Sequence, residues 1–174
     1  MNRVSQINYS KAPETVQKEH DFHIENVGKM TNMKRTLLNN IPTFRVMMEW
    51  YTMKDEAKKF LNDLEIYFLC YTISSENECA ICSLFFVKLL QEQGIDHRNF
   101  EFNARQQALV DYGRAIGKNP KSISDEVFAA LKKEFTEEQI VVITGFAAMM
   151  VATNLINHVL EVDVDGEYEG MDWK

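Results

Sequence analysis

The sequence predicts an all-helical fold for this chain of 174 residues. Three observations carry this expectation. Only seven Gly and three Pro interrupt the chain, which favours long helices over many short strands. Helix start and stop signals recur along the chain, and apolar residues return at helical intervals. Strict alternation of apolar and polar residues never holds for more than a few positions, so no β-sheet is expected.

The first third of the chain carries clear helix boundaries. Pro13 is suited to open a first helix and Gly28 to end it, because proline fixes a helical φ and glycine accepts the left-handed conformation beyond a helix C-terminus. Pro42 predicts the start of a second helix. Residues 62–65, Asn-Asp-Leu-Glu, have the form of a capping box ahead of the apolar run 66–71.

Two further helices follow in the middle of the chain. The helix that carries a pair of cysteines is expected to begin near Ser75 or Glu76 and to end at Gly94. The spacing of apolar residues predicts another helix over residues 104–116, ended by Gly117.

The last long helix predicts an oligomer. After a short amphipathic helix over 124–135, a second capping box at 136–139 opens a long apolar helix over 140–156. That segment has no formal charge, but Thr and Asn interrupt it and no aromatic or basic anchors flank it, which favours a buried helix over a membrane span. Because it is apolar on all sides it must be covered on all sides, so we expect a homo-oligomer.

Composition narrows the class of protein. The length suits one domain over residues 1–174, with a polar N-terminal stretch and an acidic C-terminal tail, and 45% apolar residues suffice for a core. A net charge of −7, with no Lys/Arg cluster, argues against nucleic-acid binding. Three cysteines and no apolar N-terminal stretch favour a reducing cytoplasm over secretion.

Neither a metal nor a cofactor is expected. His20 and His23 have ligand-like spacing, but they lie in a polar stretch and are interpreted as two exposed histidines. Asp-Val-Asp-Gly at 163–166 lacks the later ligands of a calcium loop, so the end of the chain is interpreted as an extended, solvated tail.

The spacing Cys79-Ala80-Ile81-Cys82 points to thiol chemistry. Two sulfurs three positions apart share a helix face and can close a disulfide with little backbone movement. The helix dipole favours a thiolate in the first turn. Zinc would require a second pair of ligands, which the sequence lacks. The alternative is that both thiols are small apolar core residues, as is expected of Cys70.

The surroundings of the pair resemble a known family. Residues 73–82, ISSENECAIC, are similar to the VSxxNxCxxC segment of the AhpD-like branch of the carboxymuconolactone decarboxylase superfamily. Residues 61–69 resemble the start of the preceding helix, and residues 108–143 with 154–165 resemble the C-terminal half. This resemblance, over about residues 30–165, implies an all-helical AhpD-like bundle that assembles as a homo-oligomer, usually a trimer or hexamer.

In that family's peroxidases a Cys pair acts with a His and a Glu. The resemblance matches the pair to Cys79 and Cys82, with Cys82 as the attacking and Cys79 as the resolving sulfur. The position of the His, four residues after the second Cys, is Phe86 here. Counting back to the Glu position gives Tyr67, with Glu65 two residues earlier. The chain therefore keeps both sulfurs and departs at both proton-handling positions.

This departure puts peroxidase turnover in question. Phe86 can neither take the thiol proton nor return it, and its apolar bulk should raise the thiol pKa. Loss of one general acid–base typically costs about 10²–10⁴ in rate. Tyr67 is a candidate proton donor or pocket residue, and Tyr71 is a second candidate donor. His97 and His158 are candidates only if the fold or a neighbouring subunit brings them close to the Cys pair.

Two functions remain open, and with them the question of whether the chain is an enzyme. The first is a thiol-dependent oxidoreductase of the alkylhydroperoxidase type, which reduces a peroxide or exchanges disulfides and is restored by an external dithiol. The second is a catalytically degenerate helical oligomer that binds a small apolar ligand or serves as a redox-sensitive interaction module. Its pocket would be lined by Phe85, Phe86, Tyr67 and residues of the helix over 140–156.

Overall fold

The computed structural model describes residues 2–174, and within them it contains helices but no strand. The prediction of an all-helical fold is therefore confirmed. The α-helices, in chain order, are α1 (Glu14–Val27), α2 (Asn32–Leu37), α3 (Ile41–Lys58), α4 (Asp63–Glu76), α5 (Ala80–Glu92), α6 (Ala104–Lys118), α7 (Asp125–Glu134) and α8 (Glu137–Val159). Two short 3-10 helices, η1 (Tyr9–Lys11) and η2 (Gly166–Tyr168), lie near the chain ends.

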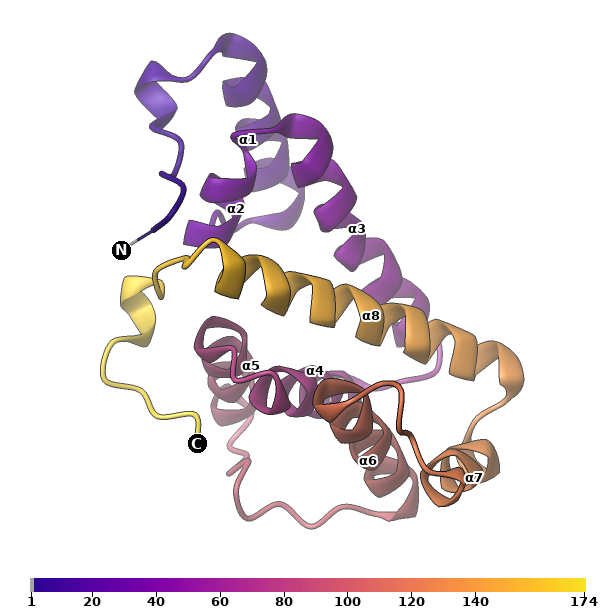
Figure 1. The fold of residues 1–174 in the computed structure, drawn as a ribbon. Coiled ribbons are helices and arrows are strands. Elements are labelled where there is room, and N and C mark those ends of the chain that lie inside the picture. Colours follow the sequence, from indigo (N-terminus) through magenta and orange to yellow (C-terminus); the bar gives the residue numbers. More distant parts are fainter. Residues whose placement is uncertain (1) are drawn as a thin grey trace.

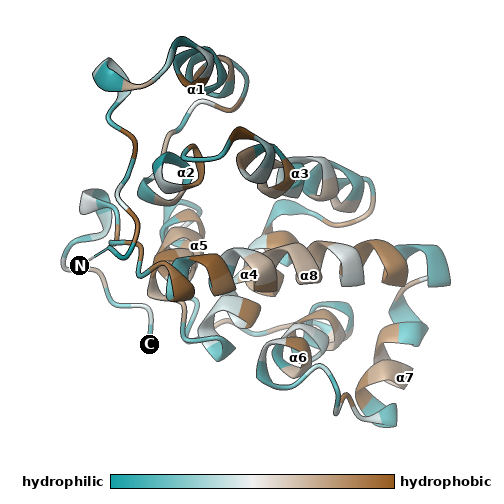
Figure 2. Cartoon of the chain, turned by 45° about the horizontal axis from the view of Figure 1, so that its top comes forward, coloured by the Kyte–Doolittle hydropathy of each residue, from teal (hydrophilic) through white to brown (hydrophobic). Residues whose placement is uncertain are grey.

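The long helix α8 is the axis of the fold (Figure 1). Helix α3 packs along one side of it, and α4 packs against it from another side while also contacting α5 and α6. Helix α7 lies at the N-terminal end of α8, and α2 lies near its C-terminal end. Figure 2 shows that α1 is mainly hydrophilic, whereas α8 is hydrophobic along most of its length. The fold thus places α3, α5 and α8 around the region where the cysteines lie.

Local capping explains why these helices begin where they do. Asn62 accepts a hydrogen bond from the backbone N–H of Glu65, and the Glu65 carboxylate accepts one from the N–H of Asn62. Thr136 and Gln139 form the same reciprocal pair at the start of α8. Each pair satisfies two backbone donors that a helix start would leave without partners. Both predicted capping boxes are confirmed.

Three groups of buried side chains hold the helices together. The largest joins α4, α5, α6 and α8, and the Cys pair belongs to it. A second joins α2 to the start of α3, and a third fixes the long connection between α5 and α6 through two phenylalanines that pack on Phe68. Burial of apolar surface contributes roughly 25 cal/mol per Å², so these groups supply most of the driving force for folding.

The start of the cysteine-bearing helix differs from the sequence prediction. Helix α4 runs through Ser75 and ends at Glu76, and α5 begins only at Ala80. Between them Glu78 has a φ of 56°, a left-handed conformation that ends one helix and redirects the chain into the next. The prediction that α5 starts near Ser75 was wrong because the break falls at a glutamate, which carries no turn signal.

Gly117 does not end α6 as predicted, since the helix continues to Lys118. It is instead a point of close helix packing. A Cβ atom added at Gly117 would lie 2.8 Å from the Cβ of Glu76 and 3.0 Å from the carbonyl oxygen of Ile73. Glycine is required there because α4 and α6 approach closely, not because the backbone needs a left-handed φ.

The C-terminal residues pack against the body of the protein, so the expectation of an extended, solvated tail was wrong. Asp165 and Tyr168 are buried, and the backbone N–H of Asn32 donates to the Asp165 carboxylate at 2.8 Å. The hydroxyl of Tyr71 donates to the carbonyl oxygen of Trp173 at 3.0 Å. These contacts hold the acidic segment against α2 and α4.

Helix α8 is long and apolar enough to cross a membrane by length and composition, and a third of its most apolar window is buried within the protein. The buried side contributes Ile143, Phe146 and Met150 to the main core, as a core helix does. The opposite side leaves Leu155 60% exposed and Val141 71% exposed. The helix therefore keeps an apolar face that its own chain does not cover.

Candidate active site

The loop between α4 and α5 is locked before the first cysteine. Asn77 donates from Nδ2 to the carbonyl oxygen of Gly117 at 2.6 Å, and its Oδ1 accepts from Asn154 at 3.0 Å. His158 Nε2 donates to the carbonyl oxygen of Asn77 at 2.8 Å, and Ser74 donates to Asn154 at 3.3 Å. Groups from α4, α6 and α8 therefore hold this short loop, and the position of the cysteine that follows is fixed by all three helices.

Cys79 is the N-cap residue of α5, and Cys82 lies in the first turn of that helix. Both thiols are free and buried, with 1% and 6% of the residue exposed. The amide Nδ2 of Asn157, on α8, donates to Cys82 Sγ at 3.3 Å and lies 3.7 Å from Cys79 Sγ. The two sulfurs therefore share one polar side chain from the facing helix.

The pKa values of the two thiols shift in opposite directions. A hydrogen bond from the Cys82 side chain lowers the pKa of Cys79 from 9.0 to about 7, with smaller contributions from the backbone amide of Cys82, Asn157 and His158 against the opposing effect of burial. The same thiol–thiol bond, followed by burial, raises the pKa of Cys82 well above 9.0. The pair thus ionises as a unit.

Beside Cys82 lies a cavity of about 260 Å³. Its wall is largely apolar and is formed mainly by side chains of α3, α5 and α8. Polar side chains from the α1–α2 region and from the C-terminal segment form one part of it. The lining residues are Val27, Lys29, Thr31, Met33, Lys34, Met47, Met48, Trp50, Tyr51, Ile81, Cys82, Phe85, Phe86, Met150, Thr153, Asn157, Asp165 and Tyr168. An apolar cavity with a few polar groups and a perturbed thiol is typical of a binding or active site.

Cys82, Phe85 and Phe86 all line this cavity. Phe86 is 2% exposed and lies one helical turn after Cys82. Tyr67 does not line the cavity. Its ring packs against that of Phe86 with the centroids 6.4 Å apart, and burial raises its pKa. Tyr67 is therefore not a residue of this cavity, although it contacts one that is.

The other candidate proton-handling groups lie elsewhere, with one exception. The carboxylate of Glu65 closes the cap of α4 and pairs with Arg105 at 2.9 Å. His97 packs on the ring of Tyr71 and lines a separate pocket. His158 is the exception, because it holds the loop before Cys79 and lowers the pKa of that thiol.

His23 also differs from its interpretation as an exposed histidine. It is buried at 4% exposure between the rings of Phe44 and Tyr51, and burial lowers its pKa to about 4. His20 contacts the adjacent carboxylate of Asp21 instead. Within residues 2–174 no group of three or more His, Cys, Asp and Glu side chains is placed to hold a metal ion.

Sequence reasoning missed Asn157 as the partner of the two sulfurs. It also missed the polar part of the cavity, where Lys34, Tyr51 and Asp165 converge from three segments. No local pattern marks these residues, since positions 34, 51 and 165 come together only through the packing of the chain.

Comparison with known proteins gives a consistent result at the level of the fold. No protein-family model matches the chain, and no curated protein matches it. Among solved structures, a peroxidase-related protein from Silicibacter sp. TM1040 is 18% identical, with 92% of this chain and 90% of that chain covered and a TM-score of 0.74. An AhpD-core peroxidase-related protein from Ralstonia eutropha JMP134 is 17% identical, with 96% and 94% covered and a TM-score of 0.75.

The debrominase Bmp8 is also similar, at 16% identity, with 95% of this chain and 93% of that chain covered and a TM-score of 0.76. A cysteine-to-alanine variant of that debrominase has been solved in complex with 2,3,4-tribromopyrrole. At these identities the likeness concerns the arrangement of the helices. The chain therefore has the helical fold of AhpD-like peroxidase-related proteins, as the resemblance of its sequence implied.

Proposed function

We propose that the chain is a thiol-dependent oxidoreductase that reduces a small apolar substrate, in the first place an organic hydroperoxide, at Cys79 and Cys82. The observation that carries this proposal is a pair of buried thiols that share the side-chain amide of Asn157, one of which, Cys82, lines a largely apolar cavity. Asn157 donates to the sulfurs and stabilises negative charge on the pair.

In this proposal Cys79 is the proton acceptor that Phe86 cannot be. With a pKa of about 7, the Cys79 thiol is about half ionised at neutral pH, and the Cys82 thiol donates to it. Transfer of that one proton along the hydrogen bond leaves the thiolate on Cys82, at the wall of the cavity. Because Asn157 contacts both sulfurs, it supports the charge before and after the transfer.

The reaction follows from this starting state. The Cys82 thiolate attacks one peroxide oxygen, the O–O bond breaks, and an S–O bond forms as the sulfenic acid. The departing alkoxide takes the proton that Cys79 received and leaves as the alcohol. The Cys79 thiolate then attacks the Cys82 sulfur and expels hydroxide, which takes a proton from solvent, and a disulfide forms. An external dithiol reduces the disulfide and is itself oxidised.

The cavity supports a small aromatic or aliphatic substrate. Apolar side chains dominate its wall, and a cavity of about 150 Å³ is already large enough for benzene, so about 260 Å³ accommodates one substituted ring. The bound tribromopyrrole of the debrominase is a molecule of this size and character. A homo-oligomer in a reducing cytoplasm is part of the same proposal, with the apolar face of α8 as the contact between subunits.

Consumption of cumene hydroperoxide with dihydrolipoamide as the reductant tests the proposal. We expect catalytic turnover in the wild type and none in Cys82→Ala or Cys79→Ala, because the first lacks the nucleophile and the second lacks both the proton acceptor and the resolving sulfur. Cys70→Ala is the matched control, because Cys70 is fully buried and burial raises its pKa, so turnover should persist. Turnover that survives in Cys82→Ala would refute the proposal.

A binding protein without turnover is the second candidate, and Phe86 favours it, since it stands four residues after Cys82, where the resemblance places a histidine. Such a protein would use the same cavity. It would protect Cys82 from alkylation when an apolar ligand is bound, yet it would not consume peroxide. Protection without turnover in the wild type would therefore select this candidate over the first.

A further inference from the structure

One wall of the cavity carries a buried cation. Lys34, on α2, lines the cavity and is only 5% exposed. Its ammonium group donates to the carbonyl oxygen of Lys29 at 2.7 Å and to the hydroxyl of Tyr51 at 2.9 Å. An ammonium has three N–H donors, so one of them has no partner among the described residues. Both of its partners are neutral oxygens.

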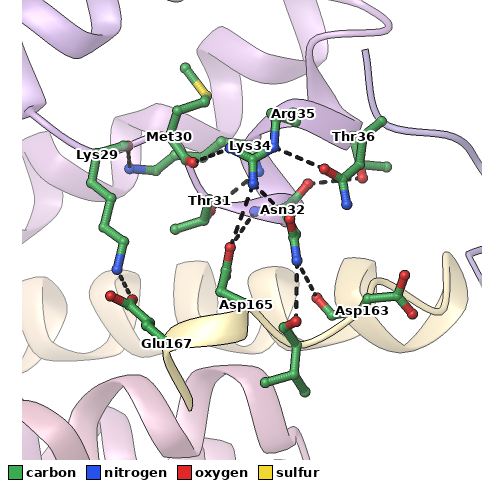
Figure 3. A network of polar contacts seen from close by, with 12 residues as sticks. Lys29, Met30, Thr31, Asn32, Lys34, Arg35, Thr36, Asp163, Asp165 and Glu167 are labelled. Atoms are coloured by element: carbon green, nitrogen blue, oxygen red, sulfur yellow. Dashed lines mark hydrogen bonds and ion pairs between the residues drawn. The ribbon is translucent and has the colours of Figure 1, made fainter. Parts of the chain in front are cut away.

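No carboxylate within residues 2–174 lies within the 4.0 Å that defines an ion pair with Lys34. Asp165 also lines the cavity, but its Oδ1 accepts from the backbone N–H of Asn32 and lies 3.9 Å from the guanidinium of Arg35 (Figure 3), and its buried Oδ2 has no hydrogen-bond partner among the described residues. Lys29, the other cation at this wall, pairs with Glu167. Lys34 is thus the cation of the cavity that lacks a direct counter-ion.

A buried charge without a partner is costly, and a cavity is where a ligand can supply the partner. The rest of the wall indicates the shape of that ligand. Trp50, Tyr51, Phe85 and Phe86 contribute aromatic rings to it, which suits a flat apolar body.

We propose that the cavity selects a small aromatic molecule with one ionised oxygen, a phenolate or a carboxylate, that Lys34 binds while the ring lies among the apolar side chains leading to Cys82. This inference names the substrate class of the proposed function and rests on that function for the role of the site. A charge-assisted hydrogen bond to a desolvated ammonium is stronger than one between neutral groups, so the anion should raise affinity by about tenfold or more.

Lys34 titrates in a pH range different from that of its neighbours His23 and Tyr51. Burial, followed by repulsion from Lys29, lowers the pKa of Lys34 to about 8, against a smaller raising effect of Asp165. The pKa of His23 is lowered to about 4 by burial, and that of Tyr51 is raised to about 12 by burial. Near pH 8, then, Lys34 loses its charge while these two neighbours do not change theirs.

Three matched probes test the inference on the reduced full chain: 4-nitrobenzoate, 4-nitrophenol and the neutral ether 4-nitroanisole. Quenching of Trp50 fluorescence in a Trp173→Phe background reports binding, because Trp50 lines the cavity and the chain has two tryptophans. We expect one or both anions to bind at least about tenfold more tightly than the ether at neutral pH. Which anion wins distinguishes a carboxylate from a phenolate ligand. Equal binding of all three probes would overturn the inference.

Two lysine variants show which residue causes the preference for an anionic probe over the ether. Lys34→Met should abolish it and leave ether binding unchanged, which also shows that the cavity is intact. Lys29→Met, at the same wall, should keep it. A preference that survives Lys34→Met, or that only Lys29→Met removes, would contradict the inference.

Should Lys34→Met fail to fold, the pH dependence of binding to Cys79→Ala decides, because the cavity thiol of that variant stays neutral near pH 7 and cannot repel the anion as the wild-type pair would. The benzoate preference should fade as pH rises through about 8, because Lys34 is then neutral while the probe stays ionised. A preference unchanged up to about pH 10 would overturn the inference. None of these measurements requires thiol turnover, so an inactive Cys pair would not be confused with a failed binding prediction.

Discussion

The side-chain amide of Asn157 lies 3.3 Å from Cys82 Sγ and forms the direct link between α8 and the first turn of α5. The same nitrogen is 3.7 Å from Cys79 Sγ. Its two N–H groups can therefore serve a negative charge on either sulfur. In the proposed mechanism this side chain, and not a residue at position 86, replaces the missing histidine as the group that supports the thiolate.

Asn157→Leu should make the pair less acidic. A hydrogen bond to a charged group contributes about 1.5–3 kcal/mol, which corresponds to about one to two pKa units. Alkylation of the pair by iodoacetamide at pH 7 should therefore slow by about tenfold or more. Thr153→Val is the matched control, because Thr153 lines the same cavity one turn earlier but its hydroxyl bonds only to Met149 of its own helix. Equal slowing in both variants would argue against a specific role for Asn157.

Phe86→His should place an imidazole one turn after Cys82, inside the buried cavity wall. The imidazolium would stabilise a Cys82 thiolate, so alkylation of Cys82 should accelerate several-fold. The same change buries a polar ring and should cost about 1–3 kcal/mol of stability. Leu84→His is the control, because Leu84 is also buried on α5 but does not line the cavity. A lower Tm without a faster Cys82 would mean that Cys82 is only a packing residue.

Gly117→Ala tests the close contact of α6 with α4. The added methyl group would lie 2.8 Å from the Cβ of Glu76 and 3.0 Å from the carbonyl oxygen of Ile73, so backbone must shift. We expect a loss of about 1–3 kcal/mol and a Tm lower by several degrees. Gly166→Ala, where nothing lies within 4 Å, should leave the Tm nearly unchanged. Equal melting of the two variants would show that the helices can separate without cost.

The sequence predicted those parts of the fold that depend on neighbouring residues. A capping box needs only two side chains three positions apart, so the starts of α4 and α8 could be recognised from Asn62 and Thr136. The break before Cys79 could not, since it depends on a left-handed Glu78 that follows Asn77, and contacts from α6 and α8 hold Asn77 in place. For the same reason Gly117 looked like a helix end, although its role is set by α4.

The local features of the candidate site could also be predicted from the sequence, whereas its long-range contacts could not. The spacing of Cys79 and Cys82 is local, and so is the position of Phe86 one turn later. The shared acidity of the thiols depends on Asn157, which is 75 positions away from Cys82 in the chain. Lys34 gave no signal at all, because a lone lysine in a polar stretch becomes a buried cation only when α3 and the C-terminal segment pack around it.

Leu155→Glu should dissociate the proposed homo-oligomer. Leu155, Val141 and Val159 lie on the uncovered side of α8 at 60%, 71% and 51% exposure, and a charge placed there would be buried in a subunit contact. Sedimentation velocity should show an oligomer for the wild type and a monomer for the variant. Val46→Glu, at a similarly exposed valine on α3, should leave the oligomer intact. A monomeric wild type at micromolar concentration would refute the prediction.

The most direct test of the central claim is a titration of the thiolate by its ultraviolet absorbance, in the wild type, Cys82→Ala and Cys79→Ala. The account predicts that one thiolate per chain forms as pH rises through about 7 in the wild type. It predicts a higher midpoint in Cys82→Ala, which lacks the largest stabilising hydrogen bond, and no ionisation near neutral pH in Cys79→Ala. Cys70 should stay silent, since burial raises its pKa. A wild type that forms no thiolate below about pH 9 would show that the pair does not share its proton and is not a working nucleophile.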